Sequence, residues 1–246
     1  MAAGNLTLSP QLLLAAERKV YSQNSEDGVL LAIFNAIGHF GSLFVEVGVS
    51  KDVAPDGVAE CNTRWLAERW NWCGVWIDAE RPERSIPLAS SVRFIRLFVR
   101  ADRISELLAV IPRDPDLLSI DIDHQDYWVL RALLSNGYRP RVICCEYNAS
   151  CGPTARLVVA EEPDAKWDGT DYFGASLAAM VALCEDHEYW LVYCESSGNN
   201  AFFIRRPCLP AGYLPVPVAD LWRTPMYGTA PGGGHPKSER KMIARG

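Results

Sequence analysis

The alternation of strand-like and helix-like patterns along the chain limits its fold more than any other feature of the sequence. Short apolar runs bounded by turn-forming residues are typical of strands, and they cover residues 42–48, 74–79, 92–99, 116–122, 141–147, 189–195 and 200–206. Helical periodicity lies between them, over residues 26–38, 58–70, 102–110, 125–136 and 174–187. Because parallel strands need crossover connections, this order predicts an α/β domain whose parallel sheet is covered by helices on both faces.

The last two predicted strands break this alternation. Only the segment from Ser196 to Asn199 separates them, whereas a parallel crossover needs about a dozen residues or more. Its length and its Ser, Gly and Asn residues are typical of a hairpin. We therefore predict a Rossmann-like, seven-stranded, mostly parallel sheet in which the last strand is antiparallel.

Composition restricts the class of partner. The chain of 246 residues is 49% hydrophobic and 22% charged, which is typical of a globular domain. Its net charge of -6 argues against a general nucleic-acid binder. No run approaches the roughly 20 apolar residues of a membrane span, and no basic and apolar leader is present. We expect a cytoplasmic protein that acts on small molecules and has no membrane partner.

The eight cysteines lack the CxxC and CxxxH spacings of structural zinc sites, so we expect reduced and mostly buried thiols. The expected organisation is an N-terminal helical cap over residues 1–40, a Rossmann-like domain over 41–207 and a C-terminal extension over 208–246, with a mobile tail at 230–240. The apolar segment LTLSPQLLLAA is compatible with packing on its own sheet or on a second subunit. A homo-oligomer therefore remains open.

Candidate site residues stand where predicted strands end. Nucleotide-binding α/β folds place ligands at the carboxyl ends of their strands. Glu46 and Gly48 end the first strand, where a glycine lets a ligand approach the backbone. Asp78 ends the second strand, and its carboxylate can accept both hydroxyls of a ribose. The alternatives are a glycine that only terminates a strand and an aspartate that only caps the next element.

The segment LLSIDIDHQDYW places acidic residues at the end of a strand that is predicted to be buried. Asp121 and Asp123 point to the same side of an extended strand, where they repel each other unless positive charge lies between them. Asp126 falls in the first turn of the following helix, where negative charge is favourable. His124 is a candidate general base because neutral imidazole works near physiological pH, and a solvated cap is the alternative.

A divalent cation would explain these acids. The next strand ends in Glu146-Tyr147-Asn148, and the ends of adjacent parallel strands lie about 5 Å apart. Carboxylate and amide oxygens suit Mg²⁺ or Ca²⁺, so the sequence predicts a metal site formed by Asp123, Glu146 and Asn148 beside Asp121. A metal-free site, in which one aspartate contacts cofactor or substrate directly, is the alternative.

Two further segments carry candidates. The segment YSQNSEDG (21–28) has the residues of a helix N-cap, and Gln23 and Asp27 could in addition face a ligand. The segment KWDGTDYFGAS (166–176) follows a long loop, and loops over strand ends often carry binding residues. We predict a substrate wall there, with packing as the alternative reading, and its candidate contacts are Trp167, Asp171 and Tyr172. In the tail, His235 and Lys237 are candidates to fold over the site.

With these residues in place, the chain resembles the FkbM-like branch of class I S-adenosylmethionine-dependent methyltransferases, and within it a bacterial group. The matching segments span residues 21–206 and are SQNSEDGVL, FVEVGV, ECNTRWLAERW, GVWIDAE, LLSIDIDHQDYWVL, RVICCEYNAS, WDGTDYFGASL and SSGNNAFFIRR. The resemblance implies the class I methyltransferase fold and O-methylation of a small polar molecule such as a sugar or natural product, with Mg²⁺ as an optional cofactor. It places S-adenosylmethionine over the first two strand ends, with Glu46 and Gly48 in the cofactor loop and Asp78 at the ribose. Together with the candidates read from the residues themselves, the expected cofactor set is Gln23, Asp27, Glu46, Gly48, Asp78 and Asp121, and the expected catalytic residues are His124 and Asp123.

The sequence departs from the family pattern at two places. In GVSKDVAPDG, Ser50 and Lys51 stand where a second glycine is expected, and His124 and Gln125 stand where Gly and Asn are expected. The GxGxxG motif of dinucleotide-binding folds is also absent. These departures leave two alternatives to a methyltransferase: an enzyme that uses the same pocket for other chemistry, and an inactive binding or partner subunit that retains the fold.

Overall fold

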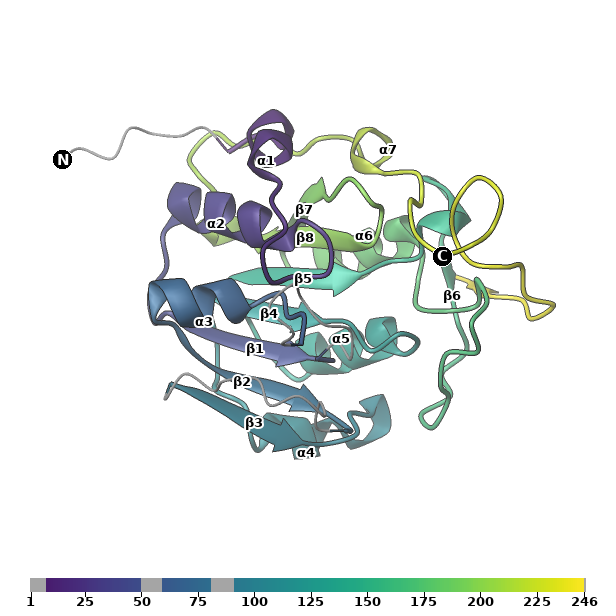
Figure 1. The fold of residues 1–246 in the computed structure, drawn as a ribbon, viewed down its shortest axis with the longest axis horizontal. Helices are drawn as coiled ribbons and strands as arrows, with labels where there is room; N and C mark the ends of the chain where they lie inside the picture. Colours follow the sequence, from purple (N-terminus) through teal and green to yellow (C-terminus); the bar gives the residue numbers. More distant parts are fainter. Residues whose placement is uncertain (1–7, 50–58, 81–90, 246) are drawn as a thin grey trace.

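The computed structural model of the protein describes residues 8–49, 59–80 and 91–245 (Figure 1). A seven-stranded sheet with the order β3-β2-β1-β4-β5-β8-β7 forms the centre. Its strands are β1 (Leu43–Val47), β2 (Cys73–Asp78), β3 (Val92–Arg96), β4 (Leu117–Ile120), β5 (Val142–Glu146), β7 (Tyr189–Cys194) and β8 (Asn200–Arg205). Each falls within or next to a run predicted from the sequence.

Strand β8 is antiparallel to both of its neighbours, β5 and β7, and the other neighbouring pairs are parallel. The predicted Rossmann-like sheet with an antiparallel last strand is thus confirmed. The turn between β7 and β8 is held by the Glu195 carboxylate, which accepts hydrogen bonds from the backbone N–H of Ser197 at 2.7 Å and of Asn199 at 2.6 Å. Gly198 in this turn has φ = 79°, a conformation that favours glycine.

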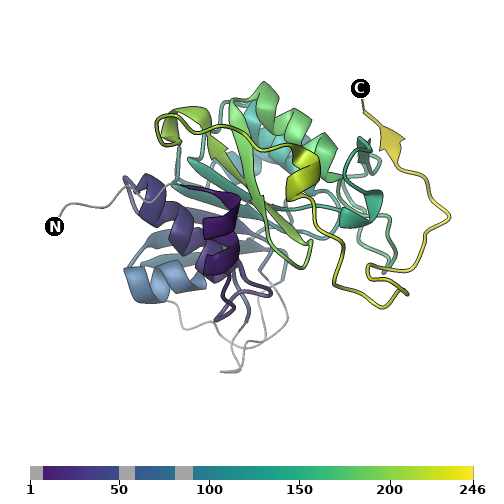
Figure 2. The ribbon, with the colours of Figure 1, turned by 90° about the horizontal axis from the view of Figure 1, so that it is seen from above.

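Helices cover both faces of the sheet (Figures 1 and 2). The α-helices are α1 (Pro10–Ala16), α2 (Glu26–Ile37), α3 (Arg64–Trp70), α4 (Ile104–Leu108), α5 (Asp126–Ser135), α6 (Leu177–Asp186) and α7 (Val218–Leu221). Alternate strand residues enter two hydrophobic clusters: Phe44 packs with α1, α2 and α3, and Val45 packs with α4, α5 and α6. This alternation is the period of two that each strand imposes on its side chains.

The C-terminal segment returns to the body of the protein. It forms strand β9 (Ile243–Ala244), which pairs antiparallel with β6 (Leu157–Val158). The tail predicted to be mobile precedes this strand and contacts the loop that follows β5, since the Asp171 N–H donates to the Pro236 carbonyl and Arg240 pairs with Glu162. Short 3-10 helices complete the description at Ala101–Arg103, Ala149–Cys151 and Arg206–Cys208.

All eight cysteines are free thiols, and five of them are buried. Within the described parts of the chain, no helix combines the length and the apolar character that crossing a membrane requires.

Candidate functional site

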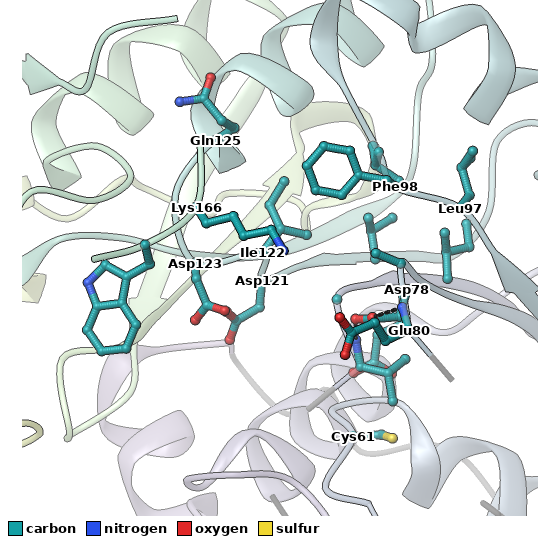
Figure 3. A pocket seen from close by; sticks show the side chains of 18 of the residues that line it. Cys61, Asp78, Glu80, Leu97, Phe98, Asp121, Ile122, Asp123, Gln125 and Lys166 are labelled. Carbon is teal, nitrogen blue, oxygen red and sulfur yellow. Dashed lines mark hydrogen bonds between the residues drawn. The ribbon is translucent and has the colours of Figure 1, made fainter. Parts of the chain in front are cut away.

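A pocket of about 510 Å³ opens at the carboxyl ends of β1, β2 and β4 (Figure 3). The strand order reverses between β1 and β4, because the chain runs outward from β1 to β3 on one side and from β4 to β5 on the other. This switch point is where ligands bind in open α/β sheets. The lining includes six acidic residues, namely Glu46, Glu60, Asp78, Glu80, Asp121 and Asp123.

The strand register brings the predicted site residues to one level. The last paired residues of β2, β1, β4 and β5 lie side by side and are Ile77, Val47, Ile120 and Cys145. The residues that follow them on the four strands are Asp78, Gly48, Asp121 and Glu146. The parallel arrangement of the sheet thus gathers residues from four distant parts of the sequence along one edge.

Gly48 directly follows β1 and lies against the backbone that follows β4. Its φ is +87°, and a Cβ atom at this position would lie 1.6 Å from the carbonyl oxygen of Asp121. The glycine is therefore required by the approach of Asp121, a reason that the sequence did not suggest. It also lines the pocket, as predicted for a residue beside a ligand.

Glu46 anchors the segment that begins α3. Its carboxylate accepts hydrogen bonds from the backbone N–H of Asn62 at 2.7 Å and of Thr63 at 3.1 Å. Burial raises the pKa of Glu46 to about 7. Glu46 therefore lines the pocket, and its hydrogen bonds hold Asn62 and Thr63 in place beside it.

Asp78 faces the pocket from the end of β2 (Figure 3). One carboxylate oxygen accepts the Val49 N–H at 3.1 Å and the other accepts the Glu80 N–H at 2.8 Å. These bonds hold the carboxylate in place. Each carboxylate oxygen can accept more than one hydrogen bond, so Asp78 keeps the capacity to bind a pair of ligand hydroxyls.

Asp121, Asp123 and Glu146 form an acidic cluster, in which one oxygen of each residue lies within 4.8 Å of the others. Figure 3 shows the carboxylates of Asp121 and Asp123 turned toward each other. Burial and the neighbouring negative charges raise the pKa of Asp121 and of Glu146 well above the ordinary range. Glu146 is 8% exposed, and its Oε2 atom has no hydrogen-bond partner among the described residues.

The turn that carries Asp123 is constrained. Asp123 has φ = +66°, a left-handed conformation that is uncommon for residues other than glycine. The Asp126 carboxylate accepts the Ile122 N–H at 2.8 Å and so closes the turn. Asp126 is the first residue of α5, the structural position predicted for it. Backbone strain of this kind often accompanies functional positions.

Asn148 lies in the scaffold behind the acidic cluster. Its amide nitrogen donates hydrogen bonds to the carbonyl oxygens of Asp171 at 2.8 Å and Phe173 at 3.0 Å. Its amide oxygen accepts the Ser150 N–H at 3.1 Å. These bonds hold the amide in the scaffold, and its oxygen keeps a second lone pair, so the role of Asn148 as a metal ligand stays a prediction.

His124 is turned away from the pocket. It is 2% exposed, its Nδ1 atom lies 2.7 Å from the Gln125 amide nitrogen, and its ring lies 5.7 Å from that of Tyr172. Burial lowers the pKa of His124, so the neutral ring is favoured. The structure brings Asp123, and not His124, to the pocket lining.

Of the other residues predicted to contact a ligand, some line the pocket and some do not. Gln23 and Trp167 line the pocket. Asp27 instead accepts the backbone N–H groups of three consecutive residues, Val20, Tyr21 and Ser22, at 2.7–2.8 Å. It therefore shapes the turn before α2 and does not line the pocket.

Asp171 and Tyr172 do not line the pocket, and other parts of the fold hold them in place. The Asp171 carboxylate lies 2.8 Å from the Lys237 ammonium. The Tyr172 hydroxyl accepts the Ala160 N–H at 3.0 Å, and the side chain is 3% exposed. Lys237 was a candidate to fold over the site. It pairs with Asp171 and does not line the pocket.

Several lining residues were not predicted. Phe98 follows β3, Gln125 precedes α5, and Lys166 directly precedes Trp167. The sequence offered one signal for Lys166, its position at the start of the segment identified as a substrate wall. The altered glycine loop at residues 50–57 lies outside the described residues, so its effect on the pocket stays a prediction.

No family model matches the sequence, and no curated protein matches it either. The structure is similar to that of MycE methyltransferase from the mycinamycin biosynthetic pathway in complex with Mg, SAH and mycinamycin VI, with a TM-score of 0.41 and 15% identity over 70% of this chain and 47% of that chain. A second MycE structure, with Mg and SAH, gives a TM-score of 0.43 and 14% identity over 74% of this chain and 50% of that chain. A fibrillarin/Nop5p complex gives a TM-score of 0.36 and 12% identity over 71% of this chain and 78% of that chain. The chain spans about half the length of the MycE chains.

Proposed function

We propose that the protein is an S-adenosylmethionine-dependent methyltransferase of the FkbM-like branch, and that it methylates a hydroxyl group of a small polar molecule such as a sugar or natural product. The observation that carries this proposal is the position of Asp78. Its fixed carboxylate lines a pocket at the switch point of the sheet, one residue beyond the level of Val47 and Ile120. A ribose bound at such a switch point is recognised by an acidic residue at this place.

The pocket suits a ligand with a positively charged centre. When bound, S-adenosylmethionine supplies a methyl group attached to a sulfonium ion. Glu46 and Asp121 line the floor between the ends of β1 and β4. Burial favours their neutral forms, and a cationic ligand beside them would favour their ionised forms and gain their attraction. Ile77, Leu97 and Val99 give the side near β2 and β3 an apolar surface on which a flat base can lie.

Asp123 is the residue we assign to proton transfer. It lines the pocket and is exposed to it, whereas His124 is buried behind the wall. In the proposed step, the acceptor oxygen forms a bond to the methyl carbon while the carbon–sulfur bond breaks and leaves its electron pair on sulfur. The hydroxyl proton passes to Asp123. The main task of the protein is then to hold the acceptor oxygen in line with that bond.

A divalent cation fits the acidic cluster. Asp121, Asp123 and Glu146 offer three oxygens within 4.8 Å of one another, and an unpartnered, buried oxygen of Glu146 belongs to the same group. Mg²⁺ prefers such oxygen ligands. Bound there, the ion would lower the pKa of an acceptor hydroxyl and offset the repulsion among the acids.

Isothermal titration with S-adenosylhomocysteine and S-adenosylmethionine, with and without Mg²⁺, tests the proposal. We expect micromolar binding that Asp78→Ala weakens at least tenfold, since the ribose would lose its acceptor. Asp102→Ala, which removes an exposed aspartate paired with Arg100, is the matched control and should bind like the wild type. A folded protein that gives no heat with either ligand would sink the methyltransferase assignment.

A further inference from the structure

Residues 160–172, which we call the wall, form a segment beside the pocket. The N-terminal end of this wall is held firmly. The side-chain amide of Gln125 donates to the Ala160 carbonyl at 3.0 Å and accepts the Glu162 N–H at 3.2 Å. The Arg240 guanidinium contacts both carboxylate oxygens of Glu162 at 2.7 Å and lies 4.0 Å from the centre of the Tyr172 ring. Both contacts to Glu162 come from the same guanidinium nitrogen, Nη2, and they join this end of the wall to the C-terminal segment.

The far end of the wall is tied to the same C-terminal segment. The Asp171 carboxylate accepts hydrogen bonds from the Lys237 ammonium and from the Ser238 N–H, both at 2.8 Å. The Asp171 N–H donates to the Pro236 carbonyl at 2.8 Å. Residues between the two ends are therefore presented to the pocket by a structured support.

Lys166 stands in the middle of this wall. Four acids near it in the sequence have other partners: Glu162 pairs with Arg240, Asp164 with Arg100, Asp171 with Lys237, and Asp168 accepts hydrogen bonds from Thr170. No described carboxylate forms an ion pair with Lys166. Figure 3 shows its side chain extending across the pocket above Asp121 and Ile122. Among the described lining residues it is the one cation.

Two aromatic rings line the same pocket. Trp167 is 37% exposed and Phe98 is 43% exposed, so both rings offer apolar surface to the pocket. The Trp167 ring is supported from behind by His235, at 4.5 Å between ring centres. Exposed apolar surface inside a pocket marks a place where a ligand packs.

A lining that combines one ammonium group with two exposed rings complements a flat group that carries negative charge. An anionic group on the ligand would form an ion pair with the Lys166 ammonium, which a neutral hydroxyl compound would not. We propose that Lys166, Trp167 and Phe98 form a subsite for a planar anionic group, and that the methyl acceptor is an aromatic hydroxy acid. The acceptor part of this inference rests on the proposed methyltransferase function, whereas the anion subsite does not.

The test compares two ligands that differ only in charge, 3,4-dihydroxybenzoate and 3,4-dihydroxybenzamide. Both are titrated into the full-length protein with Mg²⁺, in the presence and absence of saturating S-adenosylhomocysteine. We expect the acid to bind at least tenfold more tightly than the amide. Lys166→Gln should abolish this preference and Lys166→Arg should retain it. Lys241→Gln, which removes an exposed lysine outside the pocket lining, is the control and should behave like the wild type.

Three outcomes would overturn the subsite: equal affinity for acid and amide in the wild type, a preference that survives in Lys166→Gln, or no binding of either compound to a protein that binds S-adenosylhomocysteine. Weaker S-adenosylhomocysteine binding in Lys166→Gln, without any preference for the acid, would assign Lys166 to the cofactor carboxylate instead. A Lys166-dependent preference in a protein that does not bind S-adenosylhomocysteine would support the subsite and overturn the proposed methyl transfer.

Discussion

A Cβ atom on Gly48 would lie 1.6 Å from the carbonyl oxygen of Asp121. This approach joins the carboxyl ends of β1 and β4, where the order of the sheet reverses. It also sets the position of Asp121, whose carboxylate belongs to the acidic cluster with Asp123 and Glu146. The absence of a side chain at position 48 therefore determines where the cluster stands relative to the pocket.

Gly48→Ala is expected to lower the free energy of unfolding by about 3 kcal/mol, because the new methyl group meets backbone that cannot rotate away and φ is +87°. Gly38→Ala is the matched control. Gly38 has φ = +66° but nothing within 4 Å of the added Cβ, so it should cost only about 1 kcal/mol. Urea unfolding measures both. Equal losses in the two variants would show that the contact with Asp121 has no effect of its own.

Glu146→Gln is expected to raise the thermal midpoint in EDTA, because it removes one of the repelling, buried acids of the cluster. The same change should abolish stabilisation by Mg²⁺. In the wild type, Mg²⁺ at a hundred times its dissociation constant adds about 2.7 kcal/mol. Calorimetry with EDTA and with Mg²⁺ gives both quantities. Glu106→Gln, at an exposed glutamate of α4, serves as the control. A wild type whose midpoint does not respond to Mg²⁺ would contradict the metal site.

Stability should fall with rising pH through the titration of Glu46. Burial raises its pKa from 4.5 to about 7 in the folded state, so between these values the folded state binds the proton that the unfolded state has released. The stability conferred by the protonated form is complete below pH 4.5 and is lost as the pH rises through about 7. The loss amounts to roughly 3 kcal/mol.

Glu46→Gln isolates this contribution. Urea unfolding of the wild type and of this variant between pH 4.5 and 8 should give a difference in stability that changes in favour of the variant as the pH rises. Buried acids that do not interact with Glu46 cancel in the difference, whereas Asp121, whose pKa Glu46 helps to raise, contributes a smaller change in the same direction. A difference that stays constant over this range would show that Glu46 keeps its ordinary pKa.

Arg240→Met is expected to loosen the wall without unfolding the domain. Loss of the exposed pair with Glu162 should cost no more than about 1 kcal/mol. Trypsin should nevertheless cleave after Lys166 several-fold faster, since the segment would spend more time detached from the C-terminal segment. Arg103→Met removes an exposed arginine that pairs with Glu106 at 3.9 Å, and it should leave the cleavage rate at Lys166 unchanged. Mass spectrometry of timed digests identifies the site.

The strands and their directions were accessible from local patterns. Apolar runs and breakers predicted the seven strands of the main sheet, and the short link from Ser196 to Asn199 was enough to predict that β8 is antiparallel. The location of Asp78 and Asp121 in the pocket also followed, because residues after parallel strands meet at one edge. Strand alternation and turn chemistry act over a few residues, so the sequence displays them directly.

The partners of each site side chain were decided by the tertiary structure. Two neighbouring residues after β4 differ in their surroundings: Asp123 lines the pocket, and His124 packs beside Tyr172. Asn148 and Asp171 have the polar groups of ligand-binding residues, yet both are engaged by the scaffold. These outcomes depend on contacts such as that between Glu162 and Arg240, which lie 78 positions apart. A chain's local pattern determines which elements form, whereas the direction and pairing of a side chain in a loop depend on whatever distant segment the fold brings against it.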